Sequence, residues 1–289
     1  MQNRRDFLKH ASMLLAGTAF SSNLFSSCSQ SNKNIGLQLY SLRDLVKDQG
    51  IQTTLETVSK MGYKNLELAG YNDGKMYGLA PSELKKMVSD LGMKVTSSHV
   101  GQAYNKEKEA EVMGWWDQAI DAHNELGVKY MIQPWMPVND QTTLDDLKTY
   151  CDYFNTVGYK TAAASMAFGY HNHDFEFKNV EGQRIYDYLL NNTSKNHVFF
   201  QMDVYWVAQG GADPVEYMQK YADQMKVLHI KDEKEIGRSK QIDYKPIFDQ
   251  MYANNIKDYY VEVERYSEND PVASVTESFN FLNDANYVK

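Results

Sequence analysis

The sequence predicts a single α/β domain with the architecture of a (β/α)8 TIM barrel, preceded by an N-terminal export signal. Short apolar runs rich in β-branched and aromatic residues alternate with amphipathic helical segments, which is typical of parallel strands joined by helices. Eight such units fit between residues 34 and 289, and barrels of this kind run to about 250 residues. The alternative is an open doubly wound sheet. It is disfavoured because Leu39–Arg43, after the first strand, contains no glycine for a dinucleotide-binding turn.

Eight candidate strands follow one another along the chain. They are Ile35–Tyr40, Lys64–Ala69, Lys94–His99, Tyr130–Gln133, Ala167–His173, Val198–Asp203, Lys226–Ile230 and Tyr259–Glu264. Helix signals separate them. Pro81 stands in the first turn of one helix, which we expect to end at Gly92. Thr142–Asp145 begins another helix, and we expect Gly158 to end it, because glycine readily takes the left-handed conformation after a last helical turn.

The first 33 residues are predicted to be a removable signal and linker, and residues 34–289 form the barrel. Asn3–Lys9 carries a twin-arginine pattern. The apolar stretch Ala11–Phe25 that follows is too short, and too interrupted by Ser and Asn, to span a bilayer stably. The alternative is a chance arginine pair at a cytosolic N-terminus. We expect an exported, periplasmic protein.

Cys28 ends a segment that is similar to a lipoprotein cleavage box, although Phe25 stands where leucine is usual. Lipidation of Cys28 is left open, and a lipid anchor there would be the one membrane attachment that the sequence suggests. Cys151 then has no cysteine partner in the mature domain. We therefore expect no disulfide, despite an oxidising destination.

The formal net charge of −8 argues against a nucleic-acid partner, which would require a basic surface. The chain contains 21 tyrosines and 4 tryptophans, whose rings can stack on sugars but also serve as ordinary packing material. We expect a small carbohydrate as the partner, and the sequence leaves a homo-oligomer open.

Chemically capable side chains occur at the C-terminal ends of nearly all candidate strands, where TIM barrels carry their active sites. In chain order they are Gln38, Tyr40, Glu67, His99, His171, His173, Glu176 just beyond the fifth strand, Asp203, His229, Lys231, Glu262 and Glu264. This concentration predicts an active site at the C-terminal mouth of the barrel.

Three neighbouring strands each provide one metal-binding side chain at the same height, namely Asp203, His229 and Glu262. Two carboxylates and a histidine suit a divalent Mn²⁺, Co²⁺, Mg²⁺ or Zn²⁺. Without a cation the clustered carboxylates would repel each other, and one would take up a proton. The alternative is that the two carboxylates cap loops and that His229 is a satisfied core histidine.

The fifth strand is expected to supply the fourth metal ligand. His171 and His173 share one face because strand residues alternate, so one can bind the metal while the other meets the substrate. Glu176 lies three residues past the strand and could reach inward, or it could remain a loop carboxylate in solvent. His171 is our candidate ligand, and the choice among the three stays open.

Four residues are candidate general bases or acids: Lys231, Glu264, His173 and Glu176. Lys231 follows a predicted metal ligand by two residues, and a nearby cation would depress the pKa of its ammonium group. The alternative is a salt bridge from Lys231 to Asp232 or Glu264.

The remaining strand-end residues are predicted to bind substrate. They are Gln38, Tyr40, Glu67 and His99. Trp206, three residues after Asp203, is a further candidate because an indole can stack on a sugar face. A packed loop aromatic is the alternative for Trp206.

Five segments carry motifs in a familiar order: Ile35–Tyr40, Tyr170–His173, Met202–Trp206, Leu228–Asp232 and Val261–Glu262. Together they resemble the sugar phosphate isomerase/epimerase family of xylose-isomerase-like TIM barrels. That family includes keto-sugar 3-epimerases, hydroxypyruvate isomerase, inosose dehydratase and endonuclease IV. The resemblance covers roughly Asn34 to Lys289 and is more specific for the family than for a substrate.

The metal ligands usual in this family are Glu, Asp, His and Glu, from strands five to eight. The resemblance places the last three at Asp203, His229 and Glu262, whereas His171 stands where many relatives have glutamate. Trp206 stands where the keto-sugar epimerases have a histidine. Their symmetric pair of metal-bound glutamates is therefore incomplete here. This argues against simple 3-epimerisation and places the chain closer to the dehydratase-like branch.

The chemistry that the resemblance implies is proton abstraction next to a carbonyl, giving an enediolate that a metal stabilises. Reprotonation gives an isomer or epimer, and loss of a β-substituent gives elimination. Because phosphorylated sugars are cytoplasmic, we expect an exported member to act on a non-phosphorylated keto sugar, keto-glycoside or cyclitol. We thus expect a metal-dependent isomerase, epimerase or lyase. The alternatives are a non-catalytic carbohydrate-binding barrel and a phosphodiesterase-like nuclease, and the nuclease would need a basic groove.

Overall fold

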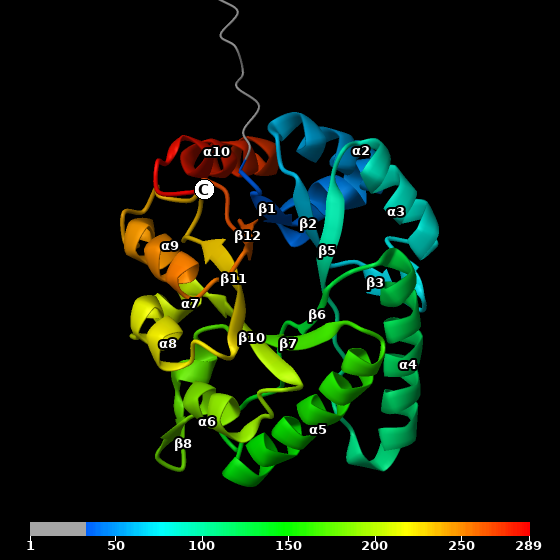
Figure 1. The fold of residues 1–289 in the computed structure, drawn as a ribbon, viewed down its shortest axis with the longest axis vertical. Coiled ribbons are helices and arrows are strands. Elements are labelled where there is room, and N and C mark those ends of the chain that lie inside the picture. Colours follow the sequence, from blue (N-terminus) through cyan, green and yellow to red (C-terminus); the bar gives the residue numbers. More distant parts are fainter. Residues whose placement is uncertain (1–32) are drawn as a thin grey trace, which may run out of the picture. The chain divides into compact units, whose positions relative to one another are not determined.

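Eight parallel strands close into a barrel in the computed structural model, which describes residues 33–289 (Figure 1). The barrel strands are β1 (Gly36–Gln38), β2 (Asn65–Leu68), β5 (Lys94–His99), β6 (Tyr130–Gln133), β7 (Ala167–His171), β10 (Val198–Asp203), β11 (Met225–Lys231) and β12 (Asp258–Glu262). Each pairs with the barrel strands before and after it, and β1 pairs with β12 to close the ring. The predicted fold is confirmed, and every strand lies within two residues of its expected bounds at either end.

Helices surround the barrel and connect its strands (Figure 1). They are α2 (Arg43–Met61), α3 (Pro81–Asp90), α4 (Glu109–Leu126), α5 (Leu144–Ala163), α6 (Ile185–Asn192), α7 (Val204–Gln209), α8 (Pro214–Lys220), α9 (Tyr244–Ala253) and α10 (Pro271–Asp284). Three 3-10 turns, η1 (Leu39–Leu42), η2 (Lys106–Lys108) and η3 (Phe175–Phe177), lie in the loops. So do two hairpins, β3 (Tyr71–Asn72) with β4 (Lys75–Met76), and β8 (Asn179–Val180) with β9 (Gln183–Arg184).

The predicted export signal, including Cys28, lies outside the described residues, so export and lipidation stay predictions. From Lys33 to the last residue of the chain, no helix combines the length and the apolar character needed to cross a lipid bilayer. Cys151 is buried and unpaired within this part of the chain.

Two apolar layers hold the barrel together. The larger one lies between the strands and the surrounding helices. The smaller one is a plug inside the barrel, formed by Ile132, Phe199, Val227 and Tyr260. Inward-facing residues two positions further along β10 and β11 are polar, because side chains on a strand alternate between faces. The plug therefore closes the barrel from one end and supports a polar site at the C-terminal ends of the strands.

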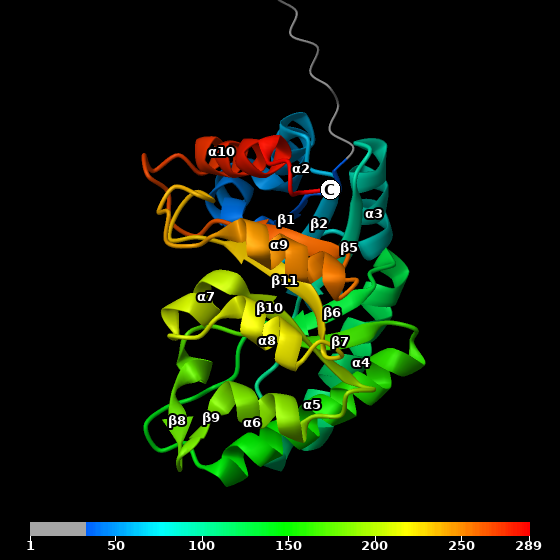
Figure 2. The same cartoon turned by 60° about the vertical axis from the view of Figure 1, so that its left-hand side comes forward.

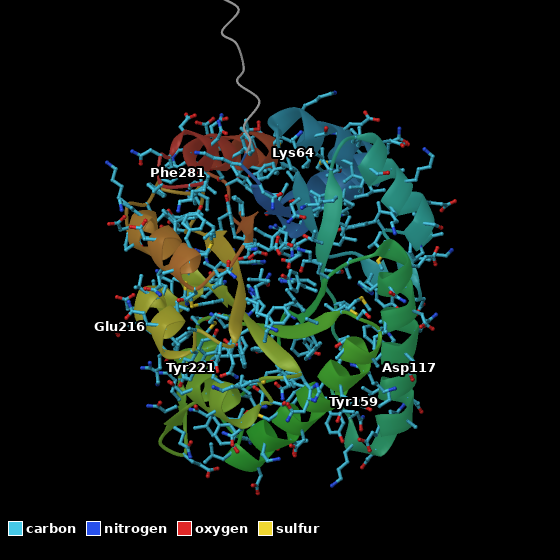
Figure 3. All side chains as sticks on the ribbon, viewed as in Figure 1. Lys64, Asp117, Tyr159, Glu216, Tyr221 and Phe281 are labelled. Atoms are coloured by element: carbon cyan, nitrogen blue, oxygen red, sulfur yellow. The ribbon has the colours of Figure 1, made fainter. Side chains whose placement is uncertain are left out.

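The outer surface of the helix ring carries the charge. Figure 3 shows Asp117 and Glu216 on the outer sides of α4 and α8. Asp117 forms an ion pair of 2.6 Å with Lys160 of α5, which links two neighbouring helices. Exposed pairs of this kind contribute little to stability. In the view of Figure 2, α7 and the β8–β9 hairpin lie on the left, among the segments that follow the C-terminal ends of β7 and β10.

One helix end differs from its prediction. Gly158 does not end α5, which continues to Ala163. Gly158 is instead buried in the helix, and a Cβ atom there would lie 2.2 Å from the carbonyl oxygen of His197. The glycine therefore serves close packing between α5 and the loop before β10. The glycine after α3 behaves as expected, because Gly92 has the left-handed φ of 71°.

We predict that Gly158→Ala lowers the free energy of unfolding by about 1–3 kcal/mol, because the new methyl group must displace backbone. The matched control is Gly114→Ala in α4, where a Cβ atom meets nothing within 4 Å. That change should instead stabilise the protein by about 0.5–1 kcal/mol through helix propensity. Urea unfolding of both variants measures the difference, and equal stabilisation by the two would contradict the close packing at Gly158.

Candidate metal centre and active site

Four buried side chains meet at the mouth of the barrel. His171 ends β7, Asp203 ends β10, His229 lies on β11, and Glu262 ends β12. Each offers one ligand atom, and these atoms all lie within 4.8 Å of one another. The structure thus brings together the three residues predicted from neighbouring strands and adds His171 as the fourth. We call these four residues the cluster.

Two buried atoms of the cluster lack hydrogen-bond partners, namely Asp203 Oδ2 and His229 Nδ1, although Nδ1 also lies 3.4 Å from Glu262 Oε2. Leaving such atoms unsatisfied costs free energy, about 1–3 kcal/mol for each neutral group and more for a charged one. Two imidazoles and two carboxylates form a donor set suited to Mn²⁺, Co²⁺ or Zn²⁺. The residues therefore fit a divalent cation, which would satisfy both atoms at once.

The cluster holds protons that a cation would displace. Burial raises the pKa of Asp203 to about 7. Burial also acts to lower the pKa of His229, but the carboxylates of Glu67 and Glu262 outweigh it and raise that pKa to about 10. Burial acts to raise the pKa of Glu262, yet Lys231 and His229 hold it well below its usual range. Because a metal binds the deprotonated groups, affinity for a cation should increase with pH.

A buried carboxylate lies beneath the cluster. Glu67 is fully buried, and its partners come from four other strands. They are Gln38 Nε2 (2.7 Å), Ser97 Oγ (2.5 Å), Gln201 Nε2 (2.7 Å), His229 Nε2 (2.5 Å) and His99 Nε2 (3.2 Å). Burial acts to raise the pKa of Glu67, but His99, His229 and the hydrogen bonds lower it to about 2. The ionised carboxylate binds His229 Nε2 and so leaves Nδ1 directed to the cluster.

Two predicted substrate-binding residues occupy this lower level instead of the cavity. Glu67 and Gln38 are both fully buried and bonded to each other. Gln38 Oε1 also accepts from the backbone N–H of Tyr40. Both residues therefore support the site from below, and the structure shows no face of either side chain that is open to a ligand.

Gln201 is a functional residue that sequence reasoning missed. Its Oε1 lies 2.7 Å from His99 Nε2 and 3.2 Å from His171 Nδ1, while its Nε2 donates to Glu67. This bond to Nδ1 leaves Nε2 of His171 as the nitrogen available to a metal. A signal was present in the sequence, because Gln201 precedes Asp203 by two residues and must share its face.

Lys231 lies beside the cluster and is 2% exposed. Its Nζ is 2.9 Å from Glu264 Oε2 and 3.3 Å from Glu262 Oε2. Burial acts to lower the pKa of Lys231, but Glu262, Asp203 and Glu264 outweigh it and raise the pKa above its ordinary value. Three carboxylates surround the ammonium group, and the ion pair with Glu264 is the alternative that the sequence left open. Lys231 is therefore a charged donor, with Glu264 as its ion-pair partner.

His173 and Trp206 complete this side of the site. Burial lowers the pKa of His173, so its ring is neutral near pH 7. Its Nδ1 is buried without a hydrogen-bond partner, and so is Nε1 of Trp206. The two ring centroids are 6.0 Å apart, and Lys231 Nζ lies 5.7 Å from the Trp206 ring. A neutral imidazole, an indole N–H and an ammonium group thus share one region.

Glu176, which was both a candidate base and a candidate ligand, lies outside the cluster. It is fully buried, and its carboxyl group accepts hydrogen bonds from the Tyr170 hydroxyl (2.5 Å) and the His173 backbone N–H (2.8 Å). Burial raises the pKa of Glu176 to about 8. These contacts hold the loop after β7, and so position His173, without opening the carboxyl group to the cavity.

A cavity of about 510 Å³ opens above the cluster. It is lined by Tyr40, Ala69, His99, Pro134, Trp135, His171, His173, Phe175, Glu262 and Glu264. Tyr40 lies in η1, two residues beyond the end of β1, and it lines this cavity. Trp135 escaped sequence reasoning because β6 ends without a charged side chain.

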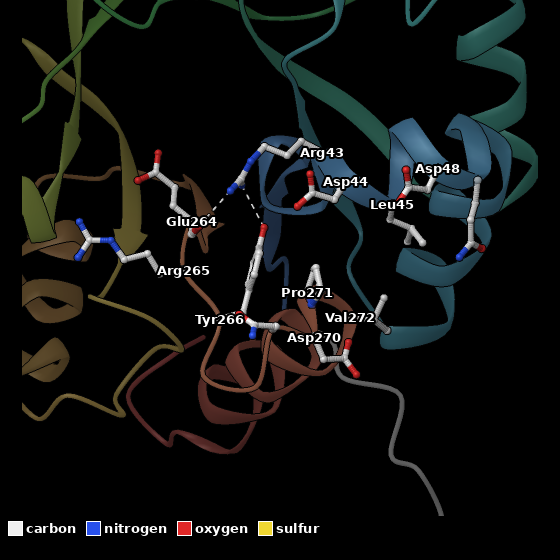
Figure 4. A pocket seen from close by; sticks show the side chains of 12 residues that line it. Arg43, Asp44, Leu45, Asp48, Glu264, Arg265, Tyr266, Asp270, Pro271 and Val272 are labelled. Carbon is white, nitrogen blue, oxygen red and sulfur yellow. Dashed lines mark hydrogen bonds between the residues drawn. The ribbon is translucent and has the colours of Figure 1, made fainter.

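A larger cavity of about 720 Å³ lies between α2 and the start of α10 (Figure 4). Arg43 crosses its wall, donating to the Glu264 carbonyl and the Tyr266 hydroxyl. The groups of potential metal ligands found in residues 33–289 do not include any residue of this lining. We therefore assign the chemistry to the smaller cavity, which contains His171 and Glu262.

Comparisons with known proteins agree with this geometry. A family model described as xylose isomerase-like TIM barrel matches residues 55–285. A solved sugar phosphate isomerase/epimerase from Parabacteroides distasonis is 41% identical, with a TM-score of 0.84, over 89% of this chain and 100% of that one. A second solved structure from the same organism is 36% identical, with a TM-score of 0.83, over 91% of this chain and 98% of that one. Inosose dehydratase from Geobacillus kaustophilus is 24% identical over 213 residues, 66% of each chain.

We predict that the stability of Glu176→Gln relative to wild type increases as the pH rises from 5 to 9. A carboxyl group whose pKa rises from about 4.5 to about 8 on folding favours the folded state at low pH. That contribution is lost progressively between these two values, and the neutral amide removes the dependence. Melting temperatures of both proteins across this range measure the effect. Glu125→Gln, at an exposed position of α4, is the control, and a difference that does not change with pH would contradict the buried protonated state.

Proposed function

The chain belongs to the xylose isomerase-like TIM barrel family, and on this premise we propose that it is a metal-dependent sugar isomerase, epimerase or β-elimination lyase. The substrate class is a non-phosphorylated keto sugar, keto-glycoside or cyclitol. The observation that carries the proposal is the cluster, with two orphaned ligand atoms, beside a neutral His173 in one cavity. A divalent cation, when bound, supplies the positive charge that stabilises an enediolate.

Three side chains of this site have different roles in the proposed proton transfers. His173 is the base that fits best, because its neutral ring lines the cavity and can take a proton from the carbon next to a carbonyl. Lys231 is charged and can donate a hydrogen bond or a proton to a substrate oxygen. Glu264 holds the ammonium group of Lys231 in place. Return of the proton gives an isomer or epimer, whereas loss of a β-substituent gives elimination.

The lining argues for a substrate without phosphate. Within the described residues, the cavity wall contains two glutamates, Glu262 and Glu264, and neither arginine nor lysine. Lys231 lies just behind them and is engaged by both. Phosphate groups are usually bound by free cationic side chains or by backbone N–H groups at helix N-termini. A neutral sugar suits this cavity better than a sugar phosphate.

Two findings favour elimination over simple epimerisation. The dehydratase relative is matched over most of the barrel, and it is named for loss of water from inosose. Trp206 stands where the resemblance expects a histidine in the keto-sugar epimerases, and an indole N–H cannot act as a base. We also propose that the twin-arginine pattern before residue 34 directs export to the periplasm, where free sugars are available.

We predict that purified protein binds a divalent ion and catalyses deuterium exchange from solvent into a keto sugar. Exchange should stop when a chelator removes the metal, and His173→Gln should reduce its rate by about 10²- to 10⁴-fold. His197→Gln, in the loop before β10, is the matched control and should leave the rate unchanged. NMR spectra recorded with added Zn²⁺ or Mg²⁺ measure the exchange. Metal binding without exchange would point to the non-catalytic carbohydrate-binding barrel.

We further predict that Glu67→Gln weakens metal binding by about 10- to 100-fold, because the amide no longer orients His229 as an ionised carboxylate does. The control is Glu235→Gln. Glu235 is 1% exposed, and its hydrogen bonds to Ser267 and Ser274 help to lower its pKa to about 2 against the effect of burial. Both variants should lose stability, but only the first should lose metal affinity in calorimetric titrations. An equal loss in both would contradict the role of Glu67.

A further inference from the structure

Two exposed aromatic side chains stand at the mouth of the cavity. Four large hydrophobic side chains of residues 33–289 are strongly exposed, and two of them, Tyr40 (44%) and Trp135 (45%), line this cavity. The other two, Tyr159 and Phe281, lie on helices α5 and α10. Large aromatic surface left in water at the rim of a pocket is typical of a binding site.

The cavity has two chemically different halves. His171, His173, Glu262 and Glu264 come from β7, from β12 and from the loops directly after them. The apolar lining comes mainly from the opposite arc of the barrel. It consists of Tyr40 after β1, Ala69 after β2, Pro134 and Trp135 after β6, and Phe175, and the polar side chain of His99 lies among them at the end of β5. A ligand that fills both halves needs a polar reacting end and a second part with an apolar face.

The two aromatic residues are held in place without being covered. Arg43 lies 4.6 Å from the centroid of the Tyr40 ring and is fixed by bonds to the Tyr40 and Glu264 carbonyl oxygens. The Tyr40 backbone N–H is bonded to Gln38. On the other side, the carbonyl of Trp135 accepts from Gln133 Nε2 at 3.0 Å. The Tyr40 ring and the Trp135 backbone are thus held in place, and an ordered ring loses little conformational entropy when a ligand covers it.

We propose that Tyr40 and Trp135 form a second subsite, which binds the group attached to the reacting sugar, so that the substrate is a keto-glycoside rather than a free keto sugar or cyclitol. The inference rests on the proposed function, because the reacting ring must lie at the cluster. A cavity of about 510 Å³ falls in the range that holds drug-sized ligands, which are larger than one sugar ring. The second ring therefore occupies the half between the aromatic residues.

The test compares free 3-keto-glucose with its phenyl β-glycoside in the presence of metal. Trp135→Ala and Tyr40→Ala should each raise KM for the phenyl glycoside by about 2- to 10-fold, the range expected for losing one aromatic contact. KM for free 3-keto-glucose should rise clearly less than KM for the glycoside in both variants. Trp135→Phe should retain most of the affinity for the glycoside. The matched control, Tyr159→Ala, removes an even more exposed ring on α5, which does not line the cavity, and should alter neither KM. Equal effects on both substrates, or none, would overturn the subsite.

A binding measurement separates this inference from the proposed function. Phenyl β-glucoside, which has no keto group and cannot react, should quench tryptophan fluorescence in the wild type but much less in Trp135→Phe. If no keto sugar exchanges deuterium and this quenching persists, the proposed function fails and the subsite stands. If exchange proceeds equally well with both substrates and quenching does not depend on Trp135, the function stands and the subsite is refuted.

Discussion

The carboxylate of Glu67 is the buried charge on which the rest of the site depends. It lies in the barrel interior just above the apolar plug, where an unpaired charge would be strongly unfavourable. Five polar side chains from β1, β5, β10 and β11 surround it. Because these strands are distant in sequence, one carboxylate fixes their inward-facing side chains relative to one another. His229 is fixed most directly, since Glu67 binds one ring nitrogen and leaves the other for the cluster.

Above this level the charges form a second, incompletely satisfied layer. Glu262 is held ionised by Lys231 and His229, whereas burial leaves Asp203 with a pKa near 7. Asp203 also stabilises the backbone, because its Oδ1 accepts a hydrogen bond from the backbone N–H of Trp206 and so caps α7. Its Oδ2 remains unbonded. A cation bound to this layer would displace protons from Asp203 and His229.

Much of this arrangement could be predicted from the sequence. Alternation along β10 and β11 placed Asp203 and His229 at the mouth, and the structure pairs these two residues in register. The depth of Glu67 could not be predicted, because it depends on the stagger between strands and on an irregularity in the pairing of β2 with β5. The position of Glu67 near the end of a strand therefore predicts contact with substrate, whereas the structure buries its side chain below the cavity. The helix end predicted at Gly158 was wrong for a similar reason, because the role of this glycine depends on a loop from another part of the chain.

The protonation state of Lys231 bears on which reaction the barrel can perform. Burial acts to lower the pKa of Lys231, but Glu262, Asp203 and Glu264 raise it above its ordinary value. His173 and Lys231 both lie against Trp206 on the same arc of the barrel. The opposite arc presents Tyr40, Ala69 and Trp135 together with His99, whose Nε2 is already engaged by Gln201 and Glu67. Proton transfer confined to one face of the substrate favours isomerisation or elimination, because inversion at a carbon requires acid–base groups on both faces.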